Sequence, residues 1–462
     1  MFSKETYAAR RKVLKKEMNS GLLIFPGNME AGMNYKDNWY PFRQDSTFLY
    51  YFGINHPDLY MIIDLDEDKE ILFGDDLTPE DMVWVGAAEP LANLAEKCGV
   101  ETVQPMSKLQ DTLQKAKQSG RALHYLPPYR SNATIEITDL TGIPIADVHQ
   151  NYSVEFVKAV AAQRSIKSTE EIQELHKAVN ITASMHRYAI KNTKHGVTEQ
   201  QIAGELQAIA IAEGGNLSFP IILTKNGQYL HNHPTQDVVK NGDIILCDCG
   251  AETSMNYAGD MTRTFPVAER FSDIQRNIYS IVLDAHETAI AALKPGYKFI
   301  DAHMLASSKI VEGLKALGLM KGDTNDAVNA GAHTLFFQCG LGHFMGMDVH
   351  DMENFGEQLV GYTQHMQKST EFGLKSLRLG KELEAGNVLT VEPGIYFNPY
   401  LIDSWKAQGK YTDFVNYSEV EKFKDFGGVR VEEDFLIDQG GVKLLGDPLA
   451  KTIEEIEELK NA

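Results

Sequence analysis

Two aspartates stand in segments of the sequence that are otherwise apolar. Asp248 lies within a run typical of a buried strand, and Asp260 opens a second strand-like run. Residues 250–259 fit a loop joining two antiparallel strands, which can bring both carboxylates to one face, within reach of one or two cations. A buried carboxylate is costly unless it is paired or bound to a metal. Asp248 alone is more simply explained as a strand end accepting backbone hydrogen bonds, and Arg263, an odd number of residues from Asp260, is expected on the opposite face.

A glycine-rich segment, residues 339–351, carries two histidines, His343 and His350, which are seven positions apart. A lone histidine is more often a hydrogen-bonded structural group than a ligand, but the glycine-rich setting favours a functional interpretation. Further along, Glu392 ends an apolar strand directly before a Pro-Gly turn. These segments add an imidazole and a third carboxylate to the candidates for one site.

The last candidate comes from residues 427–434, where polar and apolar residues alternate. Alternation puts Arg430, Glu432 and Asp434 on one face of a strand and Glu433 on the other. The polar face is expected to look into a site, so Glu432 is favoured over Glu433 as a ligand. A bulge in the strand would reverse this assignment.

The collected candidates are four carboxylates and one imidazole: Asp248, Asp260, His343, Glu392 and Glu432. This oxygen-rich set suits Mn²⁺, Mg²⁺, Fe²⁺, Co²⁺ or Zn²⁺ better than a thiolate-loving ion, with a preference for Mn²⁺. Five ligands exceed what one catalytic zinc needs. They suit two ions about 3.5–4 Å apart, bridged by carboxylates and a hydroxide.

The elements that must position these residues fall into two regions. Up to about residue 155, short apolar strands (21–25, 60–64 and 70–73) alternate with helical stretches (79–85 and 88–98), which indicates a small α/β domain. Capping boxes at Ser168, Thr198 and Ser272 then begin three helices. Strands are expected at 243–249, 260–267, 388–395 and 429–437. We expect an N-terminal domain over residues 1–158 and a larger α+β domain over residues 159–462.

Composition excludes several classes of function. The chain has 462 residues, with 44 Lys+Arg against 64 Asp+Glu, a net charge of −20. This argues against a general nucleic-acid or anionic-membrane binder. No run of apolar residues is long enough for a signal peptide or a spanning helix, and four cysteines suggest a reducing compartment, so a cytoplasmic location is expected. Cys247 and Cys249 flank Asp248 and are expected to face away from it as reduced core residues.

At these residues the sequence resembles the pita-bread metallopeptidases, which include methionine aminopeptidase, aminopeptidase P and prolidase. FRQDSTFLYYFG at 42–53 is similar to the N-terminal domain that aminopeptidase P and prolidase share. Five further motifs match the peptidase domain in order: LHNH at 230–233, YAGDMTRTFPV at 257–267, GLGHFMGMDVHD at 340–351, LTVEPGIYF at 389–397 and GGVRVEEDFLI at 427–437. The resemblance implies the pita-bread fold.

The resemblance also implies a role for each residue. Asp248 would be a terminal ligand of one ion, Asp260 and Glu432 would bridge both, and His343 and Glu392 would hold the other. Glu392 would also shuttle the proton while a metal-bridging hydroxide attacks the scissile carbonyl of an Xaa–Pro bond. His231 and His350 match the substrate-side histidines of the family, and Arg430 would help to fix the site. The substrate would be a small peptide with proline after its N-terminal residue, and the protein a homodimer.

The segments 373–397 and 423–437 look most like the prolidase branch, the Xaa–Pro dipeptidases. Arg378 stands fourteen residues before Glu392, where that branch has an arginine that grips the C-terminal carboxylate of a dipeptide. A solvated surface arginine is the alternative interpretation. Two other functions stay open: an Xaa–Pro aminopeptidase acting on longer peptides, and an inactive pita-bread binding module. Cys339 departs from the family, which often has histidine there.

Overall fold

The computed structural model describes residues 1–462, which divide into two compact units. The first unit comprises Met1–Arg164 with Met352–Leu359, and the second comprises Ser165–Asp351 with Val360–Ala462. The domain limits expected from the sequence, 1–158 and 159–462, stay a prediction. Helix α7 (Val154–Ser165) spans the boundary between these two ranges. No helix in the chain combines the length and the apolar character needed to cross a membrane.

The first unit is built on a five-stranded sheet of order β4-β3-β2-β1-β5. Its strands are β1 (Leu22–Pro26), β2 (Tyr60–Asp64), β3 (Lys69–Phe73), β4 (Thr102–Gln104) and β5 (Leu123–His124). Strands β1, β2 and β3 pair antiparallel, and β4 and β5 add in parallel at the two edges. The three strands expected from the sequence are therefore confirmed, with bounds shifted by at most one residue at each end.

Helices cover both faces of this sheet because its central strands are apolar on both sides. The helices up to residue 165 are α1 (Lys4–Glu17), α2 (Ser46–Phe52), α3 (Pro79–Val85), α4 (Leu91–Cys98), α5 (Leu109–Gln118), α6 (Ser131–Thr141) and α7. Ile24 and Ile62 share one buried cluster with Leu113 of α5 and Ile137 of α6. Phe25, the next residue after Ile24, points to the other face, where its ring packs against Phe52 of α2 and Phe156 of α7.

The second unit places several small sheets between two groups of helices. Its strands are β6 (Asn216–Leu217), β7 (Ile222–Thr224), β8 (Ile244–Cys249), β9 (Ala251–Glu252), β10 (Met261–Pro266), β11 (Val388–Val391), β12 (Gly394–Tyr396), β13 (Gly428–Arg430), β14 (Glu433–Asp438) and β15 (Gly441–Leu444). They form sheets of order β10-β8-β7, β11-β14-β15, β12-β13 and β6-β9. All pairings in this unit are antiparallel.

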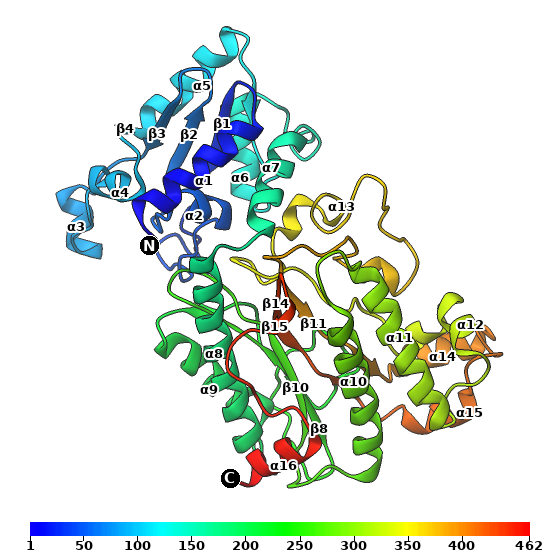
Figure 1. Cartoon of the computed structure of the whole chain (residues 1–462). Helices are drawn as coiled ribbons and strands as arrows, with labels where there is room; N and C mark the ends of the chain where they lie inside the picture. Colours follow the sequence, from blue (N-terminus) through cyan, green and yellow to red (C-terminus); the bar gives the residue numbers. More distant parts are fainter. The chain divides into compact units, whose positions relative to one another are not determined.

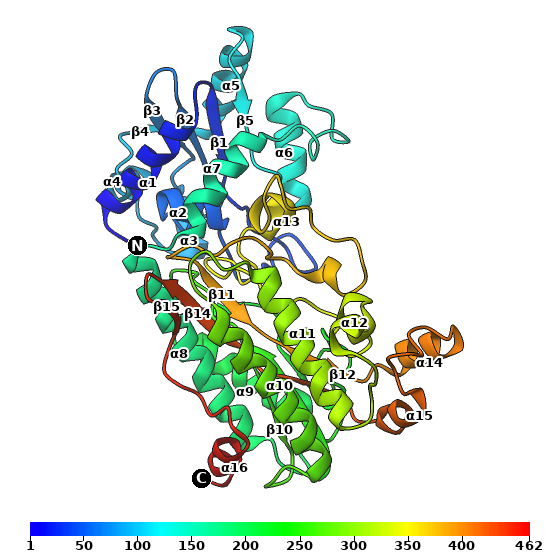
Figure 2. The same cartoon turned by 45° about the vertical axis from the view of Figure 1, so that its right-hand side comes forward.

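Four long helices flank these strands, α8 and α9 on one side and α10 and α11 on the other, and the second view keeps the same order (Figures 1 and 2). The helices after residue 165 are α8 (Thr169–Asn192), α9 (Glu199–Ala212), α10 (Asp273–Ala292), α11 (Phe299–Ala316), α12 (Thr324–Asn329), α13 (Glu357–Val360), α14 (Pro399–Ala407), α15 (Tyr417–Val420) and α16 (Ile453–Asn461). The capping boxes expected at Ser168, Thr198 and Ser272 are all formed, which explains why α8, α9 and α10 begin where they do.

Two strands that the sequence predicts as continuous are each divided in the structure. The run 388–395 becomes β11 and β12, separated by Glu392 and Pro393, because proline has no N–H to continue a ladder. The run 429–437 becomes β13 and β14, separated by Val431 and Glu432. Both breaks therefore fall at a glutamate singled out as a candidate ligand, which releases that side chain from the strict alternation of a strand.

The glycine-rich segment packs closely against β11. The backbone N–H of Thr390 donates to the carbonyl of His343, at 3.0 Å, and the N–H of Met345 donates to the carbonyl of Val388, also at 3.0 Å. A Cβ atom on Gly342 would lie 2.1 Å from the carbonyl oxygen of Thr390, so only glycine permits this approach. The glycines thus fix His343 beside the strand that leads to Glu392.

Candidate metal centre

The candidate residues line one cavity of about 710 Å³ in the second unit. Its walls include all five candidate ligands and all four residues with a proposed substrate or positioning role: Asp248, Asp260, His343, Glu392, Glu432, His231, His350, Arg378 and Arg430. These residues come from segments that span more than two hundred positions of the chain. The fold therefore brings together every site residue that the sequence singled out.

The two aspartates reach the cavity from the hairpin that the sequence predicts. Strands β8 and β10 pair antiparallel with Thr262 opposite Asp248, and Asp260 immediately precedes β10. The backbone N–H of Asp260 donates to Oδ2 of Asp434, at 3.1 Å, and this bond fixes the start of the strand. Both aspartates are almost fully buried, and Oδ1 of each has no hydrogen-bond partner. Buried acceptor atoms without a partner are expected where a cation binds.

His343 is oriented so that one ring nitrogen faces the carboxylates. Its Nδ1 lies 3.0 Å from the carbonyl oxygen of Phe344, which can only accept, so the ring proton belongs on Nδ1. The other nitrogen, Nε2, lies 3.4 Å from Oδ2 of Asp260 and 3.5 Å from Oε1 of Glu392. A neutral imidazole that donates through Nδ1 presents its lone pair on Nε2, which is the arrangement of a metal-ligating histidine.

Two adjacent glutamates, Glu432 and Glu433, point in opposite directions. Oε2 of Glu432 accepts a 2.6 Å hydrogen bond from the hydroxyl of Thr262, on the cavity side of β10. Glu433 instead forms a buried ion pair with Arg263, at 2.6 Å, and a second ion pair with the partly exposed Lys451, at 3.0 Å. The structure thus places Glu432 in the cavity, and Arg263 serves Glu433 on the other side of the strand.

Arg430 is the buried cation closest to this group of acids. Its guanidinium pairs with Oδ2 of Asp248, and its Nε donates to the hydroxyl of Thr262 at 3.0 Å. Its Nη1 donates to the hydroxyl of Tyr396 at 2.9 Å, and Nε is also 4.0 Å from Oε2 of Glu432. These contacts hold Arg430 and Asp248 in fixed positions at one side of the cavity.

The acids are poorly compensated without a cation. Burial raises the pKa of Asp260 to about 7, and the charge of Asp248 adds to the effect. Burial also raises the pKa of Glu392, and it raises that of Glu432 well above its ordinary range, where Asp260 and Glu392 contribute repulsion. A divalent ion would remove this cost because it lets the carboxylates ionise together.

The donor atoms fit divalent ions, and three of the five candidate ligands lie especially close together. Ligand atoms of Asp260, His343 and Glu432 lie within 4.8 Å of one another. Glu392 joins this group through its contact with His343, whereas Asp248 pairs with Arg430 in the structure. One imidazole and several carboxylate oxygens suit hard divalent cations.

The remaining candidates surround this group. The ring centroid of His350 is 4.3 Å from that of His343. Desolvation by its surroundings, together with the charge of Arg430, lowers the pKa of His231, so its ring is neutral at physiological pH. Arg378 lines the cavity as well. This position argues against the alternative that Arg378 is only a solvated surface arginine.

Three residues that support the site were not singled out as functional from the sequence. Thr262 bonds both Glu432 and Arg430, Thr390 accepts the backbone N–H of His343 through its hydroxyl, and Tyr396 bonds Arg430. Thr262 was within reach of sequence reasoning, because it lies two residues after Asp260 and shares its face of the strand. Nothing local marks Thr390 or Tyr396, since their contacts depend on the close approach of distant segments.

Cys339, the departure from the family pattern, also lines the cavity. Burial raises the pKa of its thiol to about 12, so the group is a neutral thiol at physiological pH rather than a thiolate ligand. Its sulfur lies 3.8 Å from the hydroxyl of Tyr396.

Comparison with known protein families and sequences gives consistent matches along the chain. The model of metallopeptidase family M24 matches residues 173–439, and the model of the aminopeptidase P N-terminal domain matches residues 7–124. An Xaa-Pro dipeptidase of Homo sapiens is 31% identical over 444 residues, which cover 94% of this chain and 88% of that protein. A probable Xaa-Pro aminopeptidase of Fusarium vanettenii is 30% identical over 443 residues, covering 95% and 92%.

Solved structures with the same fold come from the aminopeptidases P. That of E. coli, in a zinc-substituted form in complex with product, superposes with a TM-score of 0.81 at 28% identity and covers 100% of this chain and 98% of that one. The aminopeptidase PepP of Pseudomonas aeruginosa gives the same TM-score at 27% identity, with the same coverage. The pita-bread fold and the preceding α/β domain expected from the sequence are therefore confirmed.

Proposed function

The chain belongs to metallopeptidase family M24, and from this premise we propose that it hydrolyses the Xaa–Pro bond of dipeptides. The observation that carries the proposal is the single cavity lined by five candidate metal ligands together with His231, His350 and Arg378. A complete ligand set argues against an inactive binding module, in which these acids would have no reason to be buried together.

We propose that the cavity would hold two divalent ions, with Asp260 and Glu432 among the residues that would bind them. Asp248 would complete the ligands of one ion, and His343 and Glu392 those of the other. Ions in such a site supply the Lewis acidity that polarises the scissile carbonyl and lowers the pKa of a water molecule. The hard donor set favours Mn²⁺, while Co²⁺, Zn²⁺ and Fe²⁺ also suit it.

The remaining chemistry falls to side chains of the chain. Glu392 accepts a proton from the attacking water and delivers it to the proline nitrogen as the C–N bond breaks, so that water is added across that bond. His231, neutral at physiological pH, and His350 contact the substrate and the oxygen that develops negative charge. Arg430 positions Asp248 through their ion pair.

Arg378 sets the length of the substrate in this proposal. A guanidinium recognises a carboxylate through paired, charge-assisted hydrogen bonds. A dipeptide places its C-terminal carboxylate directly after proline, whereas a longer peptide has a neutral amide at that point. A clamp by Arg378 therefore favours Xaa–Pro dipeptides over Xaa–Pro–Yaa peptides.

Xaa–Pro aminopeptidase activity on longer peptides is the second candidate. Relatives of both kinds are similar to this chain at about the same identity, and the structural neighbours are aminopeptidases P. The two candidates share the metal centre and differ in the group attached to the carbonyl carbon of proline, a free carboxylate oxygen or a further residue. The discriminating residue is therefore Arg378.

A set of three substrates tests the proposal. Purified protein loaded with Mn²⁺ is given Ala-Pro, Ala-Pro amide and Ala-Pro-Ala, and release of alanine is measured over time. The proposal predicts rapid cleavage of Ala-Pro only, and Arg378→Met is expected to remove this preference. Faster cleavage of Ala-Pro-Ala would favour the aminopeptidase instead. No cleavage of any substrate by protein loaded with Mn²⁺, Co²⁺, Zn²⁺ or Fe²⁺ would overturn the proposal of peptidase activity itself.

Three further parts of the proposal concern the protein in the cell. We propose a homodimer and a cytoplasmic location, and a substrate range limited to small peptides with proline in second position. The acidic balance, −20 overall, supports the absence of nucleic-acid and anionic-membrane partners.

A further inference from the structure

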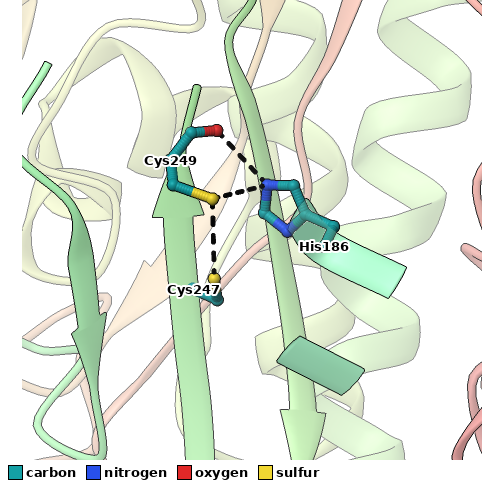
Figure 3. A group of neighbouring side chains, drawn as sticks. All are labelled: His186, Cys247 and Cys249. Carbon is teal, nitrogen blue, oxygen red and sulfur yellow. Dashed lines mark hydrogen bonds between the residues drawn. The ribbon is translucent and has the colours of Figure 1, made fainter. Parts of the chain in front are cut away.

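A second cluster of metal-ligating side chains lies behind strand β8, outside the cavity described above. Cys247 and Cys249 of β8 face the imidazole of His186, which comes from α8 (Figure 3). Asp248, between them in the strand, is directed to the opposite side. The two cysteines and the histidine are fully buried. Alternation along the strand therefore gives β8 two chemically different faces, one presenting a carboxylate and one presenting two thiols.

The distances between the ligand atoms of this cluster suit a single zinc-like ion. The sulfur of Cys247 lies 3.9 Å from that of Cys249, and the sulfur of Cys249 lies 3.4 Å from Nε2 of His186. All three ligand atoms are within 4.8 Å of one another. Zinc bonds of about 2.3 Å to sulfur and about 2.0–2.1 Å to nitrogen, at bond angles of about 100–120°, give sulfur–sulfur separations of about 3.5–4.0 Å and sulfur–nitrogen separations of about 3.3–3.8 Å.

We propose that His186, Cys247 and Cys249 form a binding site for a thiophilic divalent cation of the zinc class. Two thiolates and one imidazole are softer donors than the carboxylates of the cavity and select a different ion. Charge also favours a divalent ion, because two thiolates and one M²⁺ make a neutral unit that can be buried. Such an ion would tie α8 to β8 behind the strand that carries Asp248.

Loading changes the protonation of the cluster in a defined way. Nε2 of His186 lies 2.8 Å from the carbonyl oxygen of Met261 and 3.3 Å from that of Cys249, so in the metal-free protein it carries the ring proton. Binding of M²⁺ requires both cysteines to be thiolates and moves the ring proton from Nε2 to Nδ1. Nδ1 of His186 is buried without a hydrogen-bond partner. The affinity of this cluster for the ion is therefore expected to be lower than that of a site in which the second ring nitrogen of the histidine already donates a hydrogen bond.

Cobalt provides a readout that separates this cluster from the oxygen-rich cavity. Co²⁺ bound by thiolate sulfur shows intense sulfur-to-metal charge-transfer absorption, whereas Co²⁺ bound by carboxylates and imidazole does not. Because the cluster is buried, the protein is produced in cobalt-supplemented medium and kept in a thiol-free reductant. The proposal predicts the charge-transfer absorption in the full-length wild type, and its absence there would overturn the site.

The four cysteines of the chain supply matched controls. Cys247→Ser and Cys249→Ser are each expected to remove the absorption, together with one equivalent of bound cobalt. Cys98→Ser, at a buried cysteine of α4, and Cys339→Ser, in the cavity wall, are expected to keep it. Absorption that survives in Cys249→Ser, or that disappears only in Cys339→Ser, would contradict the proposal.

A measurement on the unmodified protein covers the case in which a serine variant fails to fold. X-ray absorption of the zinc-loaded wild type is expected to show a sulfur shell at about 2.3 Å beside the oxygen and nitrogen shell at about 2.0–2.1 Å. A spectrum without the sulfur shell would refute the site. Asp260→Asn, which disturbs only the oxygen-rich cavity, is expected to keep the sulfur shell, so the two metal proposals can fail independently.

Discussion

Replacing Asp260 by asparagine tests how much the buried acids cost the fold when no cation is bound. The substitution keeps the size of the side chain and removes one charge from a group that already has three other carboxylates. Burial, aided by Asp248, raises the pKa of Asp260 from 3.8 to about 7. At about 1.36 kcal/mol per pKa unit, this difference corresponds to about 4 kcal/mol of folding stability that is lost when Asp260 ionises in the metal-free protein.

The sign of the pH dependence is set by the direction of this pKa change. Because the folded-state pKa lies above the unfolded-state value, the metal-free fold holds more protons than the unfolded chain between about pH 4 and about pH 7. Its stability therefore falls as pH rises through that interval, and the loss is complete above it. Asparagine does not titrate, so metal-free Asp260→Asn is expected to exceed the wild type in stability by up to about 4 kcal/mol at about pH 8, and by about 2 kcal/mol at about pH 5.

Thermal unfolding in the presence of a chelator measures this difference. At about 2–4 °C per kcal/mol for a domain of this size class, Tm of the variant is expected to lie roughly ten degrees above that of the wild type at about pH 8. Adding Mn²⁺ is expected to reverse the order, because only the wild type retains the full ligand set. A variant that unfolds at a lower temperature than the chelated wild type at about pH 8 would refute the reasoning.

Asp438→Asn provides the matched control. Asp438 lies on β14, and its ion pair with Lys443 lowers the pKa of its carboxyl. Removing this charge takes away a favourable interaction, so the control is expected to lower Tm slightly at about pH 8 or leave it unchanged. A rise in both variants would indicate a general effect of reduced negative charge rather than repulsion within the cavity.

Three other perturbations have defined outcomes. Glu432→Gln is expected to abolish tight Mn²⁺ binding in calorimetry without lowering Tm under chelation. Glu433→Gln is expected to keep Mn²⁺ binding and to lose about 3–5 kcal/mol of stability, because it breaks the buried ion pair with Arg263 and the ion pair with Lys451. The opposite pattern would show that the roles assigned to the two glutamates are reversed. Lys167→Met removes the ammonium from a 2.8 Å buried ion pair with Asp351, the last residue of the glycine-rich segment 339–351, and is expected to cost about 3–5 kcal/mol of stability in urea unfolding. Unchanged stability would show that Asp351 is satisfied without Lys167. Chelation of the wild type is expected to abolish peptidase activity and Mn²⁺ to restore it; activity that persists without a divalent ion would contradict the metal requirement.

Much of the site's surroundings could be predicted from the sequence because the signals are local. The capping boxes that begin α8, α9 and α10 depend on residues three positions apart, and the hairpin that carries Asp248 and Asp260 depends on two apolar runs and the loop between them. Glu432 lies on the side of the chain that alternation predicts, although the predicted strand is broken at Val431 and Glu432. Such patterns are fixed by the geometry of one element and its immediate neighbours.

The rest depends on contacts between distant segments. The break at Glu392 coincides with Pro393 and is local, but the break at Glu432 arises where β13 pairs with β12 and β14 pairs with β11, which the run 427–437 alone does not show. The role of Thr390 requires the approach permitted by Gly342, and the hydrogen bond from Arg430 to Tyr396 requires both segments to be in place. The cluster behind β8 was equally hidden: the sequence placed Cys247 and Cys249 away from Asp248, but only the fold brings His186 to them.

Anomalous diffraction from crystals grown with Mn²⁺ tests the central claim most directly. The dinuclear proposal predicts two peaks in the cavity, about 3.5–4 Å apart, with Asp260 and Glu432 between them. His343 and Glu392 are expected beside one peak and Asp248 beside the other. A single peak, or two peaks that Asp260 does not touch, would contradict the proposed dinuclear centre.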